Sequence, residues 1–209
     1  MKLEITPIIR GSVMFQYDDL VVYIDPVSKP DYTTYPKADL ILLTHHHSDH
    51  VDKDSIDKLK KPETVIAGTT LVEEMMPGII VMNNGDKKEF FGLSVEAFPM
   101  YNVVKERSPG VKFHDKGEGN AYIIHFGETR VYVAGDTECI QEMKELSNID
   151  VAFIPIFTKA TMSPEEAAEC VKVFKPKIVY PYHQGGSDPT IFAKCLEDSG
   201  IEVRIFDLP

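Results

Sequence analysis

The chain of 209 residues has no long hydrophobic run. No apolar stretch approaches the roughly 20 residues that a helix needs to cross a bilayer, so we expect no membrane span. The N-terminal stretch of residues 1–11 also has neither the apolar segment nor the small-residue cleavage site of a secretory signal. The sequence therefore lacks the usual features of an integral membrane protein and of an exported protein.

Positive charge is scarce. Lys and Arg together number 22 against 33 Asp and Glu, which gives a formal net charge of −11. A general binder of nucleic acid or anionic membranes needs the opposite balance, because Lys and Arg neutralise phosphates. We therefore expect no nucleic-acid partner, although a local basic patch is compatible with this total.

Cysteine is also rare. The three cysteines are Cys139, Cys170 and Cys195, an odd number with wide spacings and no Cys-x-x-Cys pair. This pattern is typical of reduced thiols rather than a disulfide framework. It predicts a cytoplasmic protein with buried, free cysteines.

What is present is an ordinary globular composition, with 43% hydrophobic and 26% charged residues. A chain of this length buries about 70% of its unfolded surface, so we expect one domain over residues 1–209. Strand-like runs come first and then alternate with helical patterns, which predicts a layered α/β body. The expected strands are 20–24, 38–43, 93–98, 121–126, 130–134, 150–155, 178–180 and 201–206, and the expected helices are 52–60, 164–174 and 190–198.

The most informative segment is Thr44-His-His-His-Ser-Asp-His50, which directly follows an apolar strand. Four of the seven histidines lie in this segment. His45 and His47 project to the same side if the segment is extended, and Asp49 and His50 follow where the chain must turn. Imidazole and carboxylate groups together suit Zn, Mn, Fe or Ni. The spacing indicates a site for one or two divalent metal ions.

Two further strand ends carry ligand chemistry. Asp136 lies in Gly135-Asp136-Thr137, and His183 ends Tyr180-Pro-Tyr-His183, each after an apolar strand. Taken by itself, each residue has an ordinary structural explanation: Asp136 as a helix cap and His183 as a loop residue. Three strand ends with such side chains in one chain favour a shared metal site.

The sequence resembles the metallo-β-lactamase-fold hydrolases over essentially its whole length, and within them the branch that contains ascorbate-6-phosphate lactonase. The resemblance implies a four-layer αββα sandwich with the metals at one edge between two sheets. It also implies that His45 and His47 bind a first metal and that Asp49, His50 and His183 bind a second. Asp136 would bridge the two ions, and Asp25 would orient ligands. The resemblance rests on Gly11–Phe15, Tyr23–Pro26, the histidine-rich segment, Gly135–Thr137 and Pro181–His183.

One position departs from the family pattern. The first metal usually takes a third histidine after the strand that corresponds to residues 93–98, and here Pro-Met-Tyr-Asn102 stands instead. His114 completes the site if its loop swings inward. The alternatives are Asn102 as a weak oxygen ligand, or a first site that is incomplete. His125 lies in the middle of a strand and is expected outside the site, whereas His46 is expected to line it.

The chemistry expected at such a site is hydrolysis. A metal-bound water has its pKa lowered from about 16 to about 7, so hydroxide is available to attack a small ester, lactone or phosphoester. Asp49 and Asp136 are the candidate catalytic carboxylates, and Asp49 would carry a proton to the leaving group. The loop from Asn102 to Gly119 is long enough to be a lid. Its basic side chains are candidates to hold an anionic part of a small-molecule substrate, or else belong to a solvated loop: Lys105, Arg107, Lys112 and Lys116.

Two other functions use the same features. One is a phosphodiesterase or nuclease on the same fold, which the charge of −11 disfavours. The other is a non-catalytic metal-binding protein with a degenerate first site. The sequence names neither the substrate nor the metal, and it is compatible with a monomer or a homo-oligomer.

Overall fold

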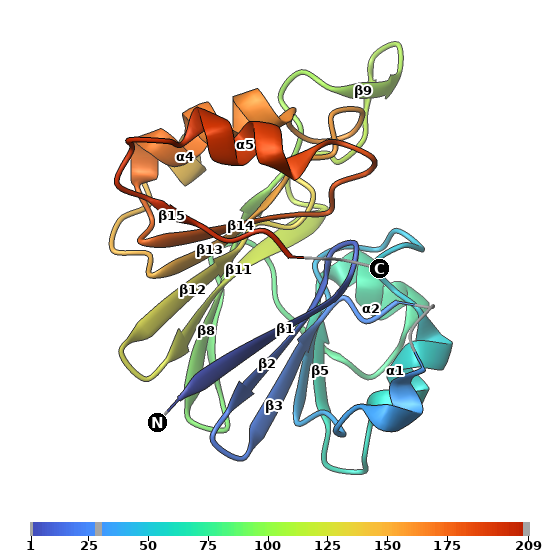
Figure 1. Ribbon diagram of the computed structural model, residues 1–209. Coiled ribbons are helices and arrows are strands. Elements are labelled where there is room, and N and C mark those ends of the chain that lie inside the picture. The colour runs from blue at the N-terminus through green and yellow to red at the C-terminus, as the bar shows by residue number, and fades with distance from the viewer. Residues whose placement is uncertain (1, 28–30, 207–209) are drawn as a thin grey trace.

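The computed structural model describes residues 2–27 and 31–206. Two β-sheets face each other, with helices on the outer face of each sheet (Figure 1). This is the αββα arrangement that the family resemblance implies, and each sheet mixes parallel and antiparallel pairs. Within the described residues, no helix is long and apolar enough to cross a membrane.

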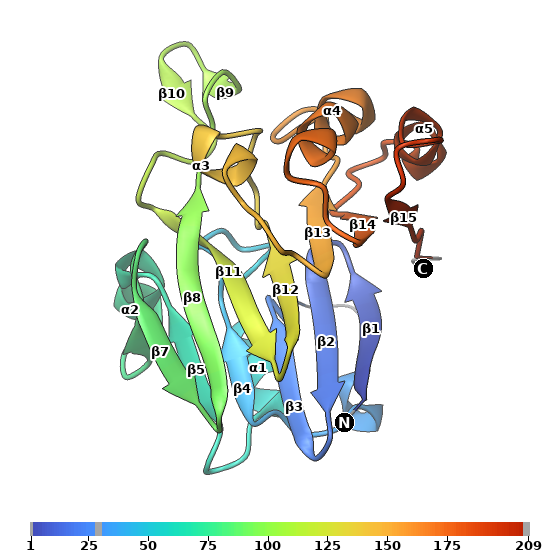
Figure 2. The ribbon, with the colours of Figure 1, turned by 90° about the vertical axis from the view of Figure 1, so that its left-hand side faces the viewer.

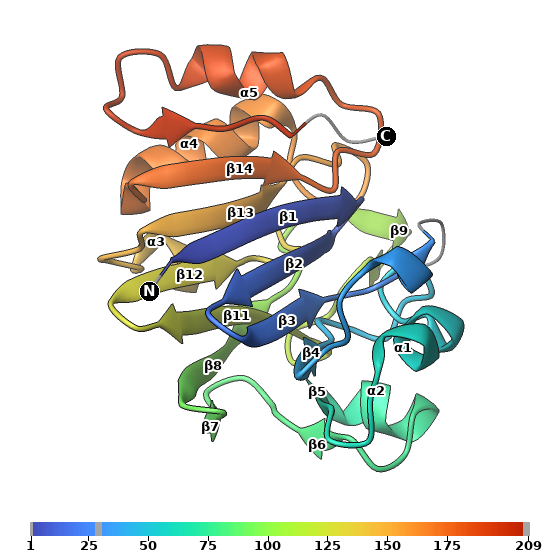
Figure 3. The same ribbon diagram turned by 60° about the horizontal axis from the view of Figure 1, so that its bottom comes forward.

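The first sheet has six strands in sequence order, as Figure 3 shows from below. Its first three strands are antiparallel and the following ones pair in parallel. The strands are β1 (Leu3–Ile9), β2 (Ser12–Tyr17), β3 (Leu20–Ile24), β4 (Leu40–Leu42), β5 (Val65–Gly68) and β6 (Ile80–Val81).

The second sheet has seven strands in the order β15-β14-β13-β12-β11-β8-β7. Strands β12 to β15 are parallel, whereas β7, β8, β11 and β12 pair antiparallel. The strands are β7 (Lys87–Phe90), β8 (Leu93–Met100), β11 (Gly119–Phe126), β12 (Thr129–Val133), β13 (Val151–Pro155), β14 (Ile178–Tyr182) and β15 (Glu202–Val203). A separate two-stranded hairpin, β9 (Glu106–Ser108) and β10 (Val111–Lys112), lies between β8 and β11 in the chain.

Three apolar layers hold the sandwich together. Between the sheets, Phe15 packs against Phe126 and Phe153 with ring centroids 5.4 and 5.6 Å apart. A second cluster lies between the second sheet and its helices, and a third between the first sheet and its helices. The helices are η1 (Tyr32–Thr34), α1 (Lys53–Leu59) and α2 (Thr70–Met75) on the first sheet, and α3 (Gln141–Lys144), α4 (Pro164–Phe174) and α5 (Pro189–Cys195) on the second.

Local sequence signals explain most of the predicted elements. The helix expected over 164–174 is α4, and Ser163 and Glu166 form the reciprocal capping box at its start. Asp52 caps α1 through the backbone N–H of Asp54. The expected strand 20–24 is β3 without change, and the other internal strands agree to within about two residues at each end.

Some expectations at the ends of elements are wrong. The last strand spans only Glu202–Val203 instead of 201–206, and α5 ends at Cys195 instead of residue 198. After α5, turn-type hydrogen bonds from Leu196 N–H to Ala193 C=O and from Ser199 N–H to Leu196 C=O replace the helical pattern. The sequence patterns do not predict the helices α2 and α3, nor these strands: β1, β2, β5, β6, β7, β9 and β10.

The expectation of reduced thiols is wrong for two of the three cysteines. Cys139 and Cys170 form a disulfide, with Cα atoms 5.7 Å apart, and Cys195 is free. Cys170 lies on the buried face of α4, and the fold brings it against the segment that follows β12. The disulfide removes the thiol argument for a cytoplasmic location, which stays a prediction.

Candidate metal centre

The predicted site residues follow four strand ends. Asp25 follows β3, the segment Thr44–His50 follows β4, Asp136 follows β12 and His183 follows β14. Strands β3 and β4 are parallel in one sheet, and β12 and β14 run parallel with β13 in the other. Carboxyl ends of parallel strands share one edge of a sheet, so the topology brings these side chains together.

The first donor group consists of His45, His47 and His114, whose ligand atoms all lie within 4.8 Å of one another. His47 Nδ1 is 3.2 Å from His45 Nε2 and 3.2 Å from His114 Nε2. Three ring nitrogens that converge on one point cannot all satisfy one another, because a neutral imidazole has a single N–H. Such a convergence suits a cation.

The second donor group consists of Asp49, His50 and His183, again within 4.8 Å. His50 Nε2 lies 3.1 Å from His183 Nε2, and the two rings are stacked with their planes 7° apart. Asp49 Oδ2 lies 3.7 Å from His183 Nε2. The first group is purely imidazole, whereas the second also contains a carboxylate.

Asp136 lies between the two groups. Its carboxylate contacts His50 Nε2 at 3.5 Å, His183 Nε2 at 3.6 Å and His114 Nε2 at 3.9 Å. The residue is only 4% exposed, and among the described residues its Oδ1 atom has no hydrogen-bond partner. A buried carboxylate oxygen without a donor is costly, and a bound metal ion would compensate it. The residues therefore fit a divalent metal centre.

Asp25 fixes the orientation of the second group. Its carboxylate accepts hydrogen bonds from Thr44 N at 2.7 Å and from Thr44 Oγ1 at 2.5 Å. His50 Nδ1 lies 2.7 Å from the same carboxylate, which leaves His50 Nε2 facing the site. Asp25 and His183 both have left-handed backbone conformations, with φ of 43° and 44°. Such conformations are costly for non-glycine residues and concentrate at functional sites.

Burial and charge divide the histidines of the metal-free site into two kinds. Burial lowers the pKa of His45, His47 and His114, in the last case to about 4, so these rings are neutral and able to bind a metal. For His50 the carboxylates of Asp136 and Asp25 outweigh burial and raise the pKa well above its ordinary value. The hydrogen bond with His183 lowers the pKa of Asp49 to about 2, which keeps this carboxylate ionised.

The β1–β2 turn closes the side of the second group. A Cβ atom on Gly11 would lie 3.2 Å from His50 Cε1 and 3.3 Å from His183 Cδ2, so glycine allows both rings to approach the backbone. Arg10 C=O accepts a hydrogen bond from His183 N, and Arg10 Nη1 lies 4.0 Å from Asp49 Oδ2. The turn thereby holds His183 at the site.

The geometry separates the roles of His114 and Asn102, which the sequence left open. His114 Nδ1 lies 2.8 Å from Asn102 Oδ1, while His114 Nε2 faces His47. The backbone N–H of His114 also donates to Asn102 Oδ1, and Asn102 Nδ2 donates to Ala160 C=O. The structure thus brings His114 into the donor group and gives Asn102 a supporting place behind it.

The remaining predicted residues lie around or outside the centre. His46 contacts the ring of His47, with centroids 4.9 Å apart, and His125 is engaged with Glu96 at 3.1 Å on the opposite part of the second sheet. Lys105 donates to Thr158 C=O, and Arg107 is exposed on β9. Lys112 pairs with Glu106 and Lys116 with Glu142. The described donor groups include none of these side chains.

Sequence reasoning missed Thr44 and Glu138. Thr44 supplies the hydrogen bonds to Asp25, and its position directly before the histidine run was a usable signal. Glu138 is buried, although charged, two residues after Asp136, and its carboxylate contacts a distant loop. Its role depends on a contact between segments more than 30 residues apart, which no local pattern encodes.

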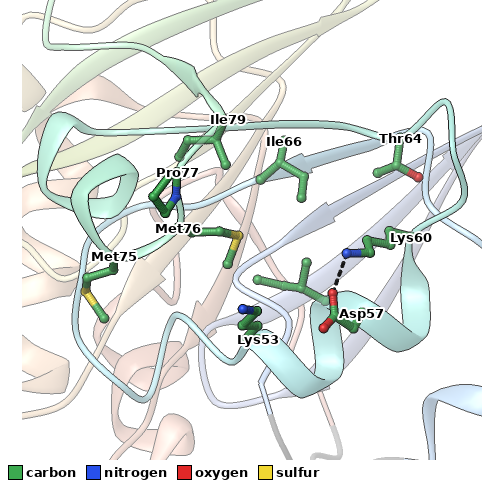
Figure 4. A pocket seen from close by; sticks show the side chains of 11 residues that line it. Lys53, Asp57, Lys60, Thr64, Ile66, Met75, Met76, Pro77 and Ile79 are labelled. Atoms are coloured by element: carbon green, nitrogen blue, oxygen red, sulfur yellow. Dashed lines mark ion pairs between the residues drawn. The ribbon is translucent and has the colours of Figure 1, made fainter.

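A pocket of about 320 Å³ lies elsewhere, between α1 and the segment after α2. Figure 4 shows Ile66 and Ile79 in its wall and the ion pair between Lys60 and Asp57, whose atoms are 2.5 Å apart. None of the candidate metal-binding residues lines it. This pocket is separate from the metal centre.

Comparison with known proteins agrees with this geometry. The model of a family described as the beta-lactamase superfamily domain matches residues 4–183. The chain is 31% identical to a UPF0173 metal-dependent hydrolase from Lysinibacillus sphaericus over 91% of each chain. It is 28% identical to a UPF0173 metal-dependent hydrolase of Methanopyrus kandleri over 97% of this chain and 95% of the relative.

Solved structures give the same result. A metal-dependent hydrolase candidate from Parabacteroides distasonis superposes with a TM-score of 0.94 at 42% identity, over 99% of this chain and 94% of that one. Igni18, a metallo hydrolase from Ignicoccus hospitalis, superposes with a TM-score of 0.79 at 25% identity, over 98% of this chain and 94% of that one.

Fold and site together define a hydrolase of the metallo-β-lactamase superfamily. Within that superfamily, the chain belongs to the UPF0173 metal-dependent hydrolase family.

Proposed function

We propose that this protein hydrolyses a small ester, lactone or phosphoester with two divalent metal ions held at the histidine-rich edge. The observation that carries the proposal is the convergence of two donor groups on the buried Asp136 carboxylate. The arrangement resembles a two-metal hydrolytic site, in which two ions act on one reacting group.

The side chains divide the work by position. His45, His47 and His114 would hold the first ion, Asp49, His50 and His183 the second, and Asp136 both. Bound ions would supply a water of lowered pKa and polarise the carbonyl or phosphoryl oxygen of the substrate. Asp25 and Asn102 orient His50 and His114 through the ring nitrogens that face away from the ions.

Asp49 is the candidate for proton transfer to the leaving group. Its side chain is 38% exposed, whereas that of Asp136 is 6% exposed, so Asp49 is the more open of the two carboxylates toward a bound substrate. Its lowered pKa keeps this carboxylate ionised at neutral pH. Asp136 is enclosed by imidazoles and is the better candidate to bridge the ions.

The chain covers its relatives almost end to end, and those relatives are themselves metal-dependent hydrolases. The lactone part of the proposal rests on the sequence resemblance to ascorbate-6-phosphate lactonase. An anionic substrate fits as well, because bound divalent ions dominate the local field despite the net charge of −11.

The test is a substrate screen on protein reconstituted separately with Zn, Mn, Fe(II) or Ni. Lactones, p-nitrophenyl esters and bis(p-nitrophenyl) phosphate are compared, with H50A as the inactive reference. We expect turnover of at least one small substrate and none by the variant. Activity confined to the phosphodiester, and falling steeply with salt, would favour the nuclease. No turnover with two metals bound would favour the non-catalytic alternative.

A further inference from the structure

Glu138 makes an unusual set of contacts. Its carboxylate is buried in a residue that is 8% exposed, and Oε2 accepts hydrogen bonds from three consecutive backbone N–H groups. The distances are 2.6 Å from Val103, 2.7 Å from Val104 and 3.1 Å from Lys105. Successive N–H groups that converge on one point form an anion-binding nest, and hydrogen bonds to an ionised acceptor are the stronger kind.

The backbone around Glu138 reinforces this contact. Glu138 N–H donates to Tyr101 C=O at 3.2 Å, and Tyr101 N–H donates to Thr137 Oγ1 at 3.2 Å. Asn102 is therefore flanked on both sides by residues bound to the segment 136–138. That segment begins with the candidate bridging ligand Asp136.

Asn102 in turn holds His114. The two residues are joined by a backbone hydrogen bond from Asn102 N–H to His114 C=O at 2.9 Å and by one from His114 N–H to the side-chain Oδ1 of Asn102 at 2.9 Å. Asn102 Oδ1 also contacts His114 Nδ1. The contacts thus run without a break from Glu138 through residues 101–105 to the His114 ring.

The intervening chain gives His114 little other support. Between Lys105 and His114 the chain forms the β9–β10 hairpin, which projects away from the body of the molecule (Figure 2). An isolated two-stranded hairpin is marginally stable in water. On the hairpin side, the place of His114 therefore depends on the base of the hairpin, where Glu138 binds.

We propose that Glu138 is a positioning residue that fastens the His114 loop to the Asp136 segment and thereby completes the first metal site. This inference rests on the proposed metal centre. It adds the residue that joins the His114 loop to the segment carrying Asp136. Loss of Glu138 should empty the first donor group and spare the second. A purely structural carboxylate would affect both groups alike, or neither.

The test is metal binding by E138Q. Glutamine has nearly the same shape, but its amide oxygen is uncharged and accepts the three N–H groups more weakly than a carboxylate does. We expect first-site affinity to fall about 10–100-fold, as for other groups that orient metal ligands. At a free-metal concentration that just fills both sites of the wild type, stoichiometry should fall from near two to near one, with second-site affinity unchanged. E138D, which keeps the charge, should recover part of the affinity.

E142Q is the matched control. Glu142 lies close by and also contacts the loop, through Tyr101 Oη at 2.9 Å and Lys116 Nζ at 2.6 Å, but it accepts no hydrogen bond from residues 103–105. It should bind two metals like the wild type. Equal loss in E138Q and E142Q, or two metals at wild-type affinity in E138Q, would overturn the proposal.

Hydrogen exchange in the metal-free protein gives a readout that needs neither metal nor turnover. In the wild type, the N–H groups of Val103, Val104 and Lys105 should be protected, and in E138Q they should exchange faster. If E138Q does not fold, hydrogen exchange of the wild type alone tests the proposal. Unprotected N–H groups at residues 103–105 would contradict it. Failure to find a substrate would affect the proposed function and leave this result intact.

Discussion

The two donor groups of the centre contain similar side chains but are supported differently. The second group is mounted on strand ends: Asp25 and Thr44 hold His50, and the β1–β2 turn holds His183. The first group takes two histidines from a strand end and the third from a loop that returns after a projecting hairpin. One group is positioned by the sheets themselves, whereas the other is complete only if a loop is correctly fastened. The first site should therefore be the weaker and more easily emptied.

The largest expected effect is at the strand-mounted group. H50A removes a ligand, leaves Asp25 without its imidazole partner and takes one of three imidazoles from Asp136, so metal binding at the second group should be lost. Hydrolysis should fall to background, because the low pKa of the bound water depends on the ions. Metal analysis of the purified protein measures the first effect.

H125A is the control, since His125 pairs with Glu96 outside the centre. It should keep both metals. Two metals per chain in H50A would contradict the assignment of the second group.

Removal of His114 tests the loop-supported group. H114A should bind close to one metal instead of two, and the second group should keep its affinity, because His114 belongs to the first donor group and not to the second. Titration with a competing chelator resolves the two affinities. If H114A still bound two metals, the first site would not need the loop. The proposed difference in support between the two groups would then be wrong.

The ligands at strand ends could be predicted from the sequence, whereas for the loop ligand the sequence left His114, Asn102 and an incomplete site as alternatives. His45, His47, Asp49 and His50 form one short pattern after an apolar strand, and Asp136 and His183 each follow another such strand. The periodicity of buried strands fixes where these side chains emerge. His114 was one of three alternatives and Glu138 was missed, because both act through contacts between distant segments, which a local sequence pattern does not determine.

The same difference between local and long-range determinants applies to the fold. Capped helices such as α4 and apolar strands such as β3 and β13 were predicted closely, because local chemistry determines them. The short helices α2 and α3 depend on the sheets they cover. The Cys139–Cys170 bond depends on α4 packing against a segment that lies 31 residues earlier in the chain.

The disulfide gives a third test of the difference between the two donor groups, because Cys139 directly follows Glu138, which binds the His114 loop. Opening a closed loop with a sequence separation of 31 residues should cost about 3–4 kcal/mol of stability in the chain-entropy model. Urea unfolding of C170S, or of the wild type under a reducing agent, measures this change. C195S, at the free cysteine, is the control and should change little.

Reduction should also weaken the first metal site more than the second, because the Asp136–Cys139 segment anchors the His114 loop. If Cys139 and Cys170 titrate as free thiols in protein purified without a reducing agent, this prediction is wrong.

The smallest effect is on the pH dependence of metal binding. His50 has a raised pKa in the metal-free protein, so it holds a proton at neutral pH that an ion must displace. Second-site affinity should therefore rise about tenfold per pH unit until the pH passes that pKa. His45, His47 and His114 have lowered pKa values and are already neutral, so first-site affinity should be flat near pH 7.

Calorimetric titration in buffers of different ionisation enthalpy measures the proton release at each site. Release of one proton from the first group, and none from the second, would reverse the contrast.

The most direct test of the central claim is a crystal structure of metal-loaded protein with anomalous scattering recorded at the absorption edge of the bound metal. We expect two peaks, one at each donor group, with Asp136 between them and His114 Nε2 about 2.0–2.1 Å from the first ion if that ion is zinc. A single peak, or a first ion without His114 among its ligands, would contradict the account.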